Sequence, residues 1–408
     1  MFKDYSTSPI DVIDSSGKWV STYRYEPYLK KWFYIEPTMK GTLTLVETED
    51  VPDEVKSSCD IIEYPHKMNS YYAPLKLQIQ LNSSCNYNCR MCYVSPEMKN
   101  AVLTIDELDE LFGKIKDIGI VRVNFVGGEI FMRKDIKDIV KTAQRHNLLV
   151  SCITNGIIPG TRLDIYEQLL SDLYMLQISC NGIEESYNYE YNTTRWHKAK
   201  RCIENVVKST STNILSFVVT QNNYNDIPEF IEFANKIKPT IIKFGTICWS
   251  GKSKNKQIEE YYSTIIPQAR EHIARARIKY PNLQIQSQLD DSESTPLWEE
   301  FINGYRPYEF YFSPEGKDGL YLSALGIYYP FPLLSDNKNF QLGRMKDDIM
   351  DIWQNNSILK DLRQVTFKNS ACGKTNCKGA CGLWNRSYAI AWSGDIYGKV
   401  PCKLTEWK

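Results

Sequence analysis

The chain has 408 residues, of which 42% are hydrophobic and 24% charged, and its formal net charge is zero. This composition is typical of a globular protein with room for two or three domains, and the balanced charge excludes a broad basic surface for nucleic acid. We find no apolar run long enough to span a membrane and no N-terminal signal peptide. Twelve cysteines without a signal indicate a reducing compartment, the cytoplasm, where thiols bind metal rather than pair.

The first 74 residues are rich in aromatic and β-forming residues. Short strands are predicted at residues 19–25 and 32–35. We interpret the region as a β-rich cap over the next domain. The alternative is a segment that recognises a peptide or another partner, because aromatic residues are enriched at interfaces.

Between residues 75 and 248, predicted strands and helices alternate. Successive βα units predict a parallel sheet with right-handed crossovers. Thr104 and Glu107 form a capping box that opens the first helix. The expected strands are 75–81, 121–126, 148–153, 174–179, 214–220 and 240–247. The expected helices are 104–118, 134–146, 162–171, 195–208 and 227–238.

Cys85, Cys89 and Cys92 form a C-x3-C-x2-C triplet on the loop that follows the first of these strands. Cysteine thiolates are the usual ligands of iron–sulfur clusters, and three thiolates leave one iron of a four-iron cluster open to a small molecule. The alternatives are a zinc site or three structural thiols. Zinc is disfavoured because structural zinc sites use four ligands and no fourth Cys or His lies nearby.

The triplet, followed by Tyr93, resembles the signature of radical S-adenosylmethionine (SAM) enzymes. The resemblance implies a partial (β/α)6 barrel, which the six predicted strands suit. It also implies a 4Fe–4S cluster whose open iron is chelated by the amino and carboxylate groups of SAM. A reductant such as flavodoxin or ferredoxin would supply the electron that splits SAM into a 5′-deoxyadenosyl radical.

Gly127, Gly128 and Glu129 end the apolar run of the second strand and resemble a motif of the same family. The resemblance implies that the acid and the nearby backbone hold the SAM amino group. An ammonium needs a carboxylate or carbonyl partner, and glycines allow a backbone to approach a ligand closely. A Gly-Gly-Glu sequence alone usually marks only a turn. Here it lies at a strand end one βα unit after the cysteines, and this position supports the resemblance.

Several polar residues follow later strands. Asn155 either belongs to a turn before a helix or lines the SAM site, and Ser179 is similar to a SAM-contacting serine of the family. Arg195 is either a forked donor to the SAM carboxylate or a solvated cation. Cys248 is either a hydrogen-atom donor to a substrate radical or a small buried residue. Four cysteines are assigned to packing: Cys59, Cys152, Cys180 and Cys202.

Cys372, Cys377, Cys381 and Cys402 form a second set near the end of the chain. Four thiolates fill a 4Fe–4S cluster completely, and a four-thiolate zinc site is the alternative. With a hairpin expected at 319–329 and a helix at 347–355, the order is similar to the SPASM extension of radical SAM enzymes. That extension usually carries seven cysteines for two auxiliary clusters, so the four cysteines here predict one auxiliary iron–sulfur cluster.

We therefore expect three domains: a β-rich segment at 1–74, a radical SAM barrel at 75–280 and a small iron–sulfur domain at 281–408. The expected enzyme is an oxidoreductase or peptide-modifying maturase. It would crosslink, dehydrogenate or epimerise a ribosomally made peptide. The first alternative is a dehydrogenase or epimerase of a small metabolite such as an aminoglycoside. The second is a non-catalytic iron–sulfur protein for electron transfer or binding.

Overall fold

The computed structural model of the chain contains two sheets, one of four strands and one of ten. It describes residues 10–13, 19–26, 31–35, 46–48, 51–53, 71–94, 102–248, 250–253, 260–289, 316–365, 369–371 and 386–399. Five cysteines of the sequence analysis lie outside these residues: Cys59, Cys372, Cys377, Cys381 and Cys402. None of the helices in the described part combines the length and apolar character that crossing a bilayer requires.

The N-terminal sheet is antiparallel throughout, in the order β1-β2-β3-β4. Its members are β1 (Ile10–Ile13), β2 (Trp19–Glu26), β3 (Lys31–Ile35) and β4 (Val46–Thr48). The two strands predicted in this region are therefore confirmed as β2 and β3.

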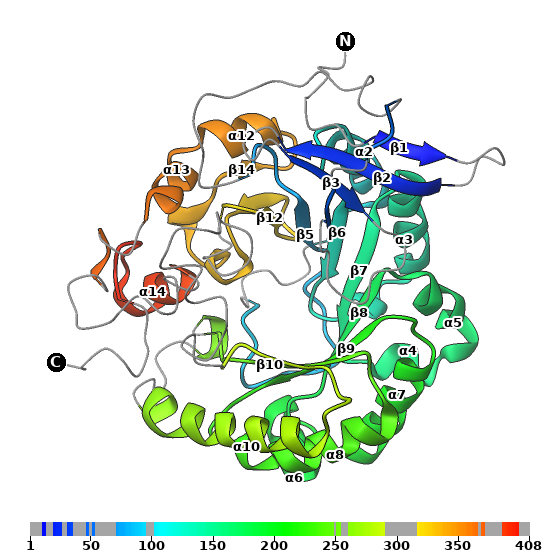
Figure 1. Ribbon diagram of the computed structural model, residues 1–408, viewed down its shortest axis with the longest axis vertical. Helices are drawn as coiled ribbons and strands as arrows, with labels where there is room; N and C mark the ends of the chain where they lie inside the picture. The colour runs from blue at the N-terminus through cyan, green and yellow to red at the C-terminus, as the bar shows by residue number, and fades with distance from the viewer. Residues whose placement is uncertain are drawn as a thin grey trace.

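The ten-stranded sheet contains the six strands predicted from the sequence, all parallel to their neighbours. They are β5 (Lys76–Gln80), β6 (Arg122–Val126), β7 (Leu149–Thr154), β8 (Met175–Ser179), β9 (Asn213–Val218) and β10 (Ile241–Gly245). In Figure 1 these strands lie inside a ring of helices. The α/β partial barrel is confirmed.

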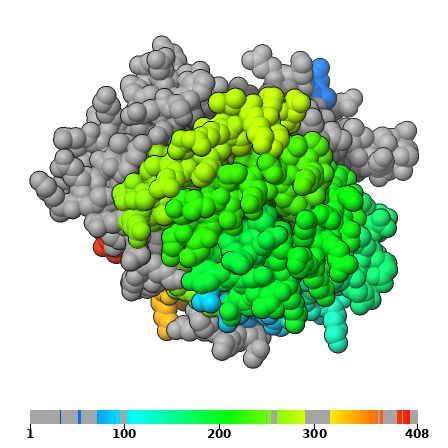
Figure 2. Space-filling view, turned by 90° about the horizontal axis from the view of Figure 1, so that it is seen from below, coloured from blue at the N-terminus to red at the C-terminus, as the bar shows by residue number. Residues whose placement is uncertain are grey.

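The helices that connect the strands cover the outside of the sheet (Figure 1). The predicted ones are α2 (Ile105–Asp117), α3 (Ile136–Arg145), α5 (Leu163–Asp172), α7 (Trp196–Lys208) and α8 (Ile227–Ile237). The sequence did not predict α4 (Ile157–Thr161) and α6 (Glu184–Tyr191). A π-helical turn (Tyr261–Ile265) runs into α10 (Ile266–Lys279), and Figure 2 shows α10 in yellow-green lying across the green segments of this face.

Side chains alternate between the two faces of the sheet. Leu77, Ile79, Val123 and Phe125 are fully buried and pack with apolar residues of the helices in one core. The opposite face turns into the barrel and is mixed. Its polar residues are Lys76, Gln78, Gln80, Arg122, Asn124, Ser151, Gln177, Ser216 and Lys243, and its apolar residues include Val126, Ile153, Met175, Ile214 and Ile241.

The sheet extends past the six strands at both edges. At one edge β11 (Ile285–Ser287) is parallel to β10. At the other, β12 (Gly319–Leu322) is parallel to β5 and begins the predicted hairpin with β13 (Ile327–Tyr329), which is followed by β14 (Gly343–Arg344). One sheet thus crosses the expected boundary after residue 280, and the division into three domains stays a prediction.

The C-terminal part adds short helices beside the hairpin (Figure 1). They are α12 (Ile349–Asn355), α13 (Ser357–Gln364) and α14 (Arg386–Ser393). Trp353 of α12 is fully buried, and its indole N–H donates to the Tyr71 carbonyl at 2.9 Å. This contact fixes α12 to the segment that enters β5.

Candidate active site

The three cysteines of the triplet lie on the loop between β5 and α2, which we call the cluster loop (residues 82–102). All three are free thiols; Cys85 is exposed, and Cys89 and Cys92 are half-buried. Among the described residues, no three His, Cys, Asp or Glu side chains converge on a single metal ion. A cluster does not require such convergence, because each thiolate binds its own iron.

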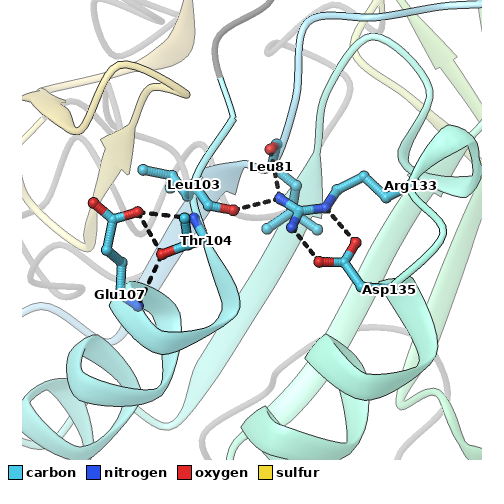
Figure 3. Close-up of polar contacts among 6 residues, drawn as sticks. All are labelled: Leu81, Leu103, Thr104, Glu107, Arg133 and Asp135. Atoms are coloured by element: carbon cyan, nitrogen blue, oxygen red, sulfur yellow. Dashed lines mark hydrogen bonds and ion pairs between the residues drawn. The ribbon is translucent and has the colours of Figure 1, made fainter.

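Arg133 closes the base of the cluster loop (Figure 3). Its buried guanidinium donates to the carbonyls of Leu81, at 3.0 Å, and Leu103, at 2.6 Å, which lie at the two ends of the loop. Asp135 accepts two hydrogen bonds from the same guanidinium, at 2.9 and 2.6 Å. The sequence analysis missed Arg133, although its position shortly after Gly-Gly-Glu and its Asp neighbour were available signals.

The Gly-Gly-Glu segment packs against the first turn of the cluster loop. Gly128 N–H donates to the Asn82 carbonyl at 2.9 Å, and Glu129 N–H donates to the Ser84 carbonyl at 2.8 Å. A Cβ at Gly127 would overlap Asn82, and a Cβ at Gly128 would overlap the Ser84 backbone. The close approach that the glycines allow is therefore an approach to the cluster loop itself.

Glu129 is almost completely buried, and both of its carboxylate oxygens are hydrogen-bonded. One oxygen accepts from the Thr154 hydroxyl at 2.7 Å and from Phe131 N–H at 3.2 Å. The other accepts from Asn155 N–H at 2.9 Å. Burial raises the pKa of Glu129 to about 6, although these hydrogen bonds oppose the shift.

Asn155 connects the end of β7 to the cluster loop. Its side-chain amide donates to the Asn86 side-chain oxygen at 2.7 Å, and its own oxygen accepts from Ile157 N–H at 3.1 Å. The structure thus brings the predicted Cys85 region, Gly127, Gly128, Glu129 and Asn155 into one contact network. Asn155 makes the turn that one reading predicted, and the other reading, a residue that lines the SAM site, stays a prediction.

Residues 250–253 hold the other side of the cluster loop. Lys252 N–H donates to the Cys92 carbonyl at 3.0 Å, and its ammonium donates to the Cys89 carbonyl at 3.1 Å and to the Asn88 side chain. Gly251, with φ of 57°, lies so close that a Cβ would be 2.6 Å from the Cys92 carbonyl oxygen. The sequence analysis missed both residues, and no local pattern marks them.

The unpredicted helix α6 supports the middle of the loop. Arg90 N–H donates to the Glu190 carbonyl at 2.9 Å, and its guanidinium donates to the Tyr189 carbonyl at 3.0 Å. That guanidinium also lies 4.3 Å from the centre of the Tyr189 ring. The Tyr87 ring packs 5.2 Å from the Tyr191 ring.

Burial raises the pKa of two of the cysteine thiols, Cys85 and Cys89, and so favours their protonated form. Desolvation raises the pKa of Cys85 to about 11, although Tyr87 N–H donates to its sulfur at 3.4 Å and favours the thiolate. Burial also raises the pKa of Cys89, against the nearby charge of Lys252. Because iron binds thiolates, loading a cluster must release these protons.

Cys248 lies just beyond β10, half-buried and near the C-terminal part of the chain. Burial raises the pKa of its thiol to about 11, with opposing contributions from Tyr388, which lowers it, and Cys92, which raises it. Tyr388 belongs to α14, and its hydroxyl lies 3.0 Å from the Thr246 hydroxyl. The sequence analysis did not predict that α14 reaches this strand end.

The remaining candidates lie around this network. Tyr93 is half-buried against the core, and Ser179 is half-buried at the end of β8. Asn181, two residues after Ser179, donates to the Met91 sulfur at 3.7 Å. Arg195 is exposed at the start of α7, close enough to Tyr87 to influence its pKa, and none of the described contacts joins it to the cluster loop.

A parallel partial barrel with three free cysteines after its first strand and a buried glutamate after its second defines a class of cluster-dependent enzymes. Residues 79–234 match the radical SAM superfamily. These residues form a radical SAM domain, so the chain is an enzyme, and the cofactors of this domain are a 4Fe–4S cluster and SAM. The non-catalytic alternative of the sequence analysis is therefore wrong.

Three known proteins show how far the similarity extends. The PqqA peptide cyclase of Bradyrhizobium diazoefficiens is 24% identical over 352 residues, which cover 81% of this chain and 87% of that protein. A probable GTP 3′,8-cyclase of Thermoplasma volcanium is 27% identical over 165 residues, covering 39% of this chain and 50% of that protein. The crystal structure of Streptococcus suis SuiB bound to precursor peptide SuiA has a TM-score of 0.71 and 14% identity, and covers 97% of this chain and 100% of that chain.

Proposed function

We propose that this radical SAM enzyme modifies a ribosomally made peptide by crosslinking, dehydrogenation or epimerisation. The observation that supports a peptide is the extent of the similarity. The match to a peptide cyclase spans 81% of the chain, whereas the match to a GTP cyclase spans 39%. Regions outside the barrel usually determine the substrate, since the barrel supports many chemistries. A small metabolite such as an aminoglycoside remains the second candidate.

In this proposal Cys85, Cys89 and Cys92 hold the catalytic cluster. The residues fit, because three free thiols share one loop that Arg133 and Lys252 fix from two sides. When bound, the cluster and SAM would supply the radical chemistry that removes a hydrogen atom from the substrate. The protein positions the substrate and excludes water.

Glu129 supplies the negative charge that binds the SAM ammonium in this proposal. With a pKa of about 6 it is ionised at neutral pH. Gly127, Gly128 and Asn155 place that carboxylate beside the cluster loop. The other residues proposed to line the SAM site are Tyr93, Ser179 and Arg195.

Cys248 is proposed to donate a hydrogen atom to a substrate radical if the product is an epimer. Its raised pKa keeps the sulfur protonated at neutral pH, so the transferable hydrogen is present. Tyr388 and Thr246 lie beside it, in the interior of the protein. A crosslinked or dehydrogenated product needs an electron acceptor instead.

An auxiliary SPASM-like iron–sulfur cluster held by Cys372, Cys377, Cys381 and Cys402 is the proposed acceptor. Flavodoxin or ferredoxin is the proposed source of electrons for SAM cleavage. Residues 1–74 would cap the barrel or help to hold the peptide. The barrel and the C-terminal cluster region keep the proposed boundaries 75–280 and 281–408.

Product analysis tests the proposal. The reconstituted enzyme is incubated anaerobically with SAM, dithionite and short peptides encoded beside its gene, and 5′-deoxyadenosine and peptide mass are measured. We expect a loss of 2 Da for a crosslink or dehydrogenation, or deuterium incorporation from solvent without that loss for an epimer. Turnover of an aminoglycoside, with every peptide unchanged, would favour the metabolite.

The role of the second cluster is tested with Cys377→Ala. We expect this variant to keep part of its SAM cleavage and to lose modified peptide, because the auxiliary cluster acts after the first hydrogen abstraction. Cys202→Ala, which removes a buried thiol of α7, is the control and should keep both. Wild-type product yield from Cys377→Ala would contradict the role.

A further inference from the structure

Three basic side chains face the inside of the barrel, two from the strand starts opposite the cluster loop and one from the middle of β10 (Ile241–Gly245). Lys76 and Arg122 are the first residues of β5 and β6 and are paired in register. Lys243 lies on β10, which β7, β8 and β9 separate from β6 in the sheet. Their sequence neighbours Leu77, Val123 and Ile242 belong to the core under the helices. Because strand side chains alternate, the three cations share the inner face.

The cations face one another across the inside of the barrel. The charges of Lys76 and Arg122 lower the pKa of Lys243, in addition to the larger effect of burial. Burial also lowers the pKa of Arg122. Since β6 and β10 are not neighbours, these charges meet only through the barrel interior.

Negative charge is scarce at this place. Asp318, next to the first residue of β12, forms an ion pair with Lys76 at 2.6 Å and attracts Arg122 at longer range. Arg122 Nε is buried and has no hydrogen-bond partner among the residues that the structure describes. Within the described part of the chain, neither Arg122 nor Lys243 has an ion pair, so one carboxylate faces three cations.

Neighbouring positions of the inner face also have unused hydrogen-bonding atoms. Asn124, the next inward-facing residue of β6 after Arg122, pairs in register with Ser151 of β7. The Asn124 side-chain oxygen and the Ser151 hydroxyl are buried, and neither has a hydrogen-bond partner in the described part of the chain. Native proteins satisfy almost all buried polar atoms, by water or a ligand where the chain does not. Half-buried cations such as Arg122 and Lys243 also gain from a negative charge that faces them.

We propose that Lys76, Arg122 and Lys243 form a binding site for a small oxyanion, a phosphate or a carboxylate, inside the N-terminal end of the barrel. An oxyanion accepts hydrogen bonds from the Arg122 guanidinium and the Lys243 ammonium together and reduces their mutual repulsion. β5 rises about 3.3 Å per residue, so the six residues from Lys76 to the start of the cluster loop place the backbone of Lys76 roughly 20 Å from that loop. The site is therefore separate from the SAM site.

The bound oxyanion stabilises the junction between the barrel and the C-terminal part. Lys76 lies on β5 and Asp318 immediately precedes β12, the strand that joins the two parts. Together with the Asp318 carboxylate, the oxyanion balances the positive charges of the basic side chains at this junction. The inference rests on the inner face of the barrel alone and does not depend on the proposed substrate.

Calorimetric titration of the reconstituted full-length protein with inorganic phosphate tests the site, at ionic strength held constant with chloride. We expect saturable binding, and a loss of about tenfold or more in affinity for Arg122→Gln and for Lys243→Gln, the usual cost of a charge-assisted hydrogen bond. Asp318→Asn should bind phosphate more tightly, because it removes the competing carboxylate. Lys236→Gln, which removes an exposed lysine of α8, should bind like the wild type.

Thermal unfolding separates a ligand site from a purely structural lysine. In chloride alone, Lys243→Gln should unfold at or above the wild-type temperature, since it relieves repulsion, and only the wild type should gain stability from phosphate. A parallel titration with acetate distinguishes the two kinds of oxyanion. A site that takes a carboxylate ligand binds acetate, and a site selective for phosphate does not. Equal phosphate affinity in the wild type, Arg122→Gln and Lys243→Gln would overturn the proposal.

Discussion

The charged side chains at the two ends of the barrel differ in burial and in pairing: Glu129 and Arg133 are buried, whereas Arg122 and Lys243 are half-buried. At the cofactor end, Glu129 accepts three hydrogen bonds, and Arg133 satisfies two carbonyls and one carboxylate. At the other end, Arg122 and Lys243 have no ion pair in the described structure. Arg122 begins the strand that Glu129 closely follows, so the contrast appears within one βα unit.

At the cofactor end, the chain itself supplies the hydrogen-bond partners of the charged groups. At the opposite end, the proposed oxyanion would supply them. A buried charge is costly unless it is paired, and catalytic geometry must be fixed before the cofactor arrives. The cofactor end meets that need with contacts from β7, α6 and residues 250–253. The opposite end leaves its cations available to an external anion.

The largest effect is expected from Cys89→Ala, which removes a proposed ligand of the catalytic cluster. SAM cleavage should fall to the background level, because a cluster that lacks a thiolate is not retained. The measurements are 5′-deoxyadenosine by chromatography and iron content per chain. Cys202→Ala is the matched control and should keep wild-type values.

Cys89→Ala also tests whether the two ends of the barrel bind their ligands independently. Its affinity for phosphate should equal that of the wild type, since the basic site is distant and uses other residues. If Cys89→Ala still produced 5′-deoxyadenosine at the wild-type rate, the assignment of the triplet as cluster ligands would be wrong.

Lowering the pH is expected to weaken SAM binding by about tenfold between pH 7.5 and pH 5. The pKa of Glu129 is raised to about 6, so the carboxyl group loses its charge as the pH falls through that value. One pH unit below the pKa leaves about a tenth of the groups ionised, and the neutral acid does not attract an ammonium. Calorimetry with SAM measures the affinity.

Glu129→Gln is the informative variant for this profile. It should bind SAM weakly at pH 7.5 and show little further change at pH 5. Visible absorbance recorded at each pH verifies that the cluster itself survives. A wild-type pH profile in Glu129→Gln would assign the titration to another group.

Much of the barrel could be predicted from the sequence because its signals are local. Alternating residues marked β5 and β6, and the Thr104–Glu107 capping box marked the start of α2, which the structure confirms with both reciprocal hydrogen bonds. Cysteine spacing and Gly-Gly-Glu selected the loops of the site. These patterns depend on neighbours a few positions apart.

The contacts that fix the cluster loop could not be predicted in this way. Lys252 donates a hydrogen bond to the carbonyl of Cys89, which lies 163 positions earlier in the sequence. Arg133 donates to the carbonyl of Leu81, 52 positions earlier. A lone lysine or arginine in a sequence is usually a solvated charge. The pairing of β12 with β5 joins residues more than 200 positions apart, and only the folded chain reveals it.

The smallest effect is expected from glycine substitutions that test how tightly the cluster loop is held. Gly251 and Gly394 both have positive φ, of 57° and 73°, so alanine is strained at each by about 1 kcal/mol. The two positions differ in the room that they leave for an added side chain. A Cβ at Gly251 would lie 2.6 Å from the Cys92 carbonyl oxygen, whereas a Cβ at Gly394 meets no atom within 4 Å.

Gly251→Ala should therefore cost about 1–3 kcal/mol more than Gly394→Ala, because the backbone beside Cys92 must shift. The shift should shorten the lifetime of the cluster in an iron-chelator challenge, followed by visible absorbance, while Gly394→Ala loses iron at the wild-type rate. If both variants lost iron equally fast, backbone strain alone would explain the effect. The contact between residues 250–253 and the cluster loop would then contribute nothing to cluster retention.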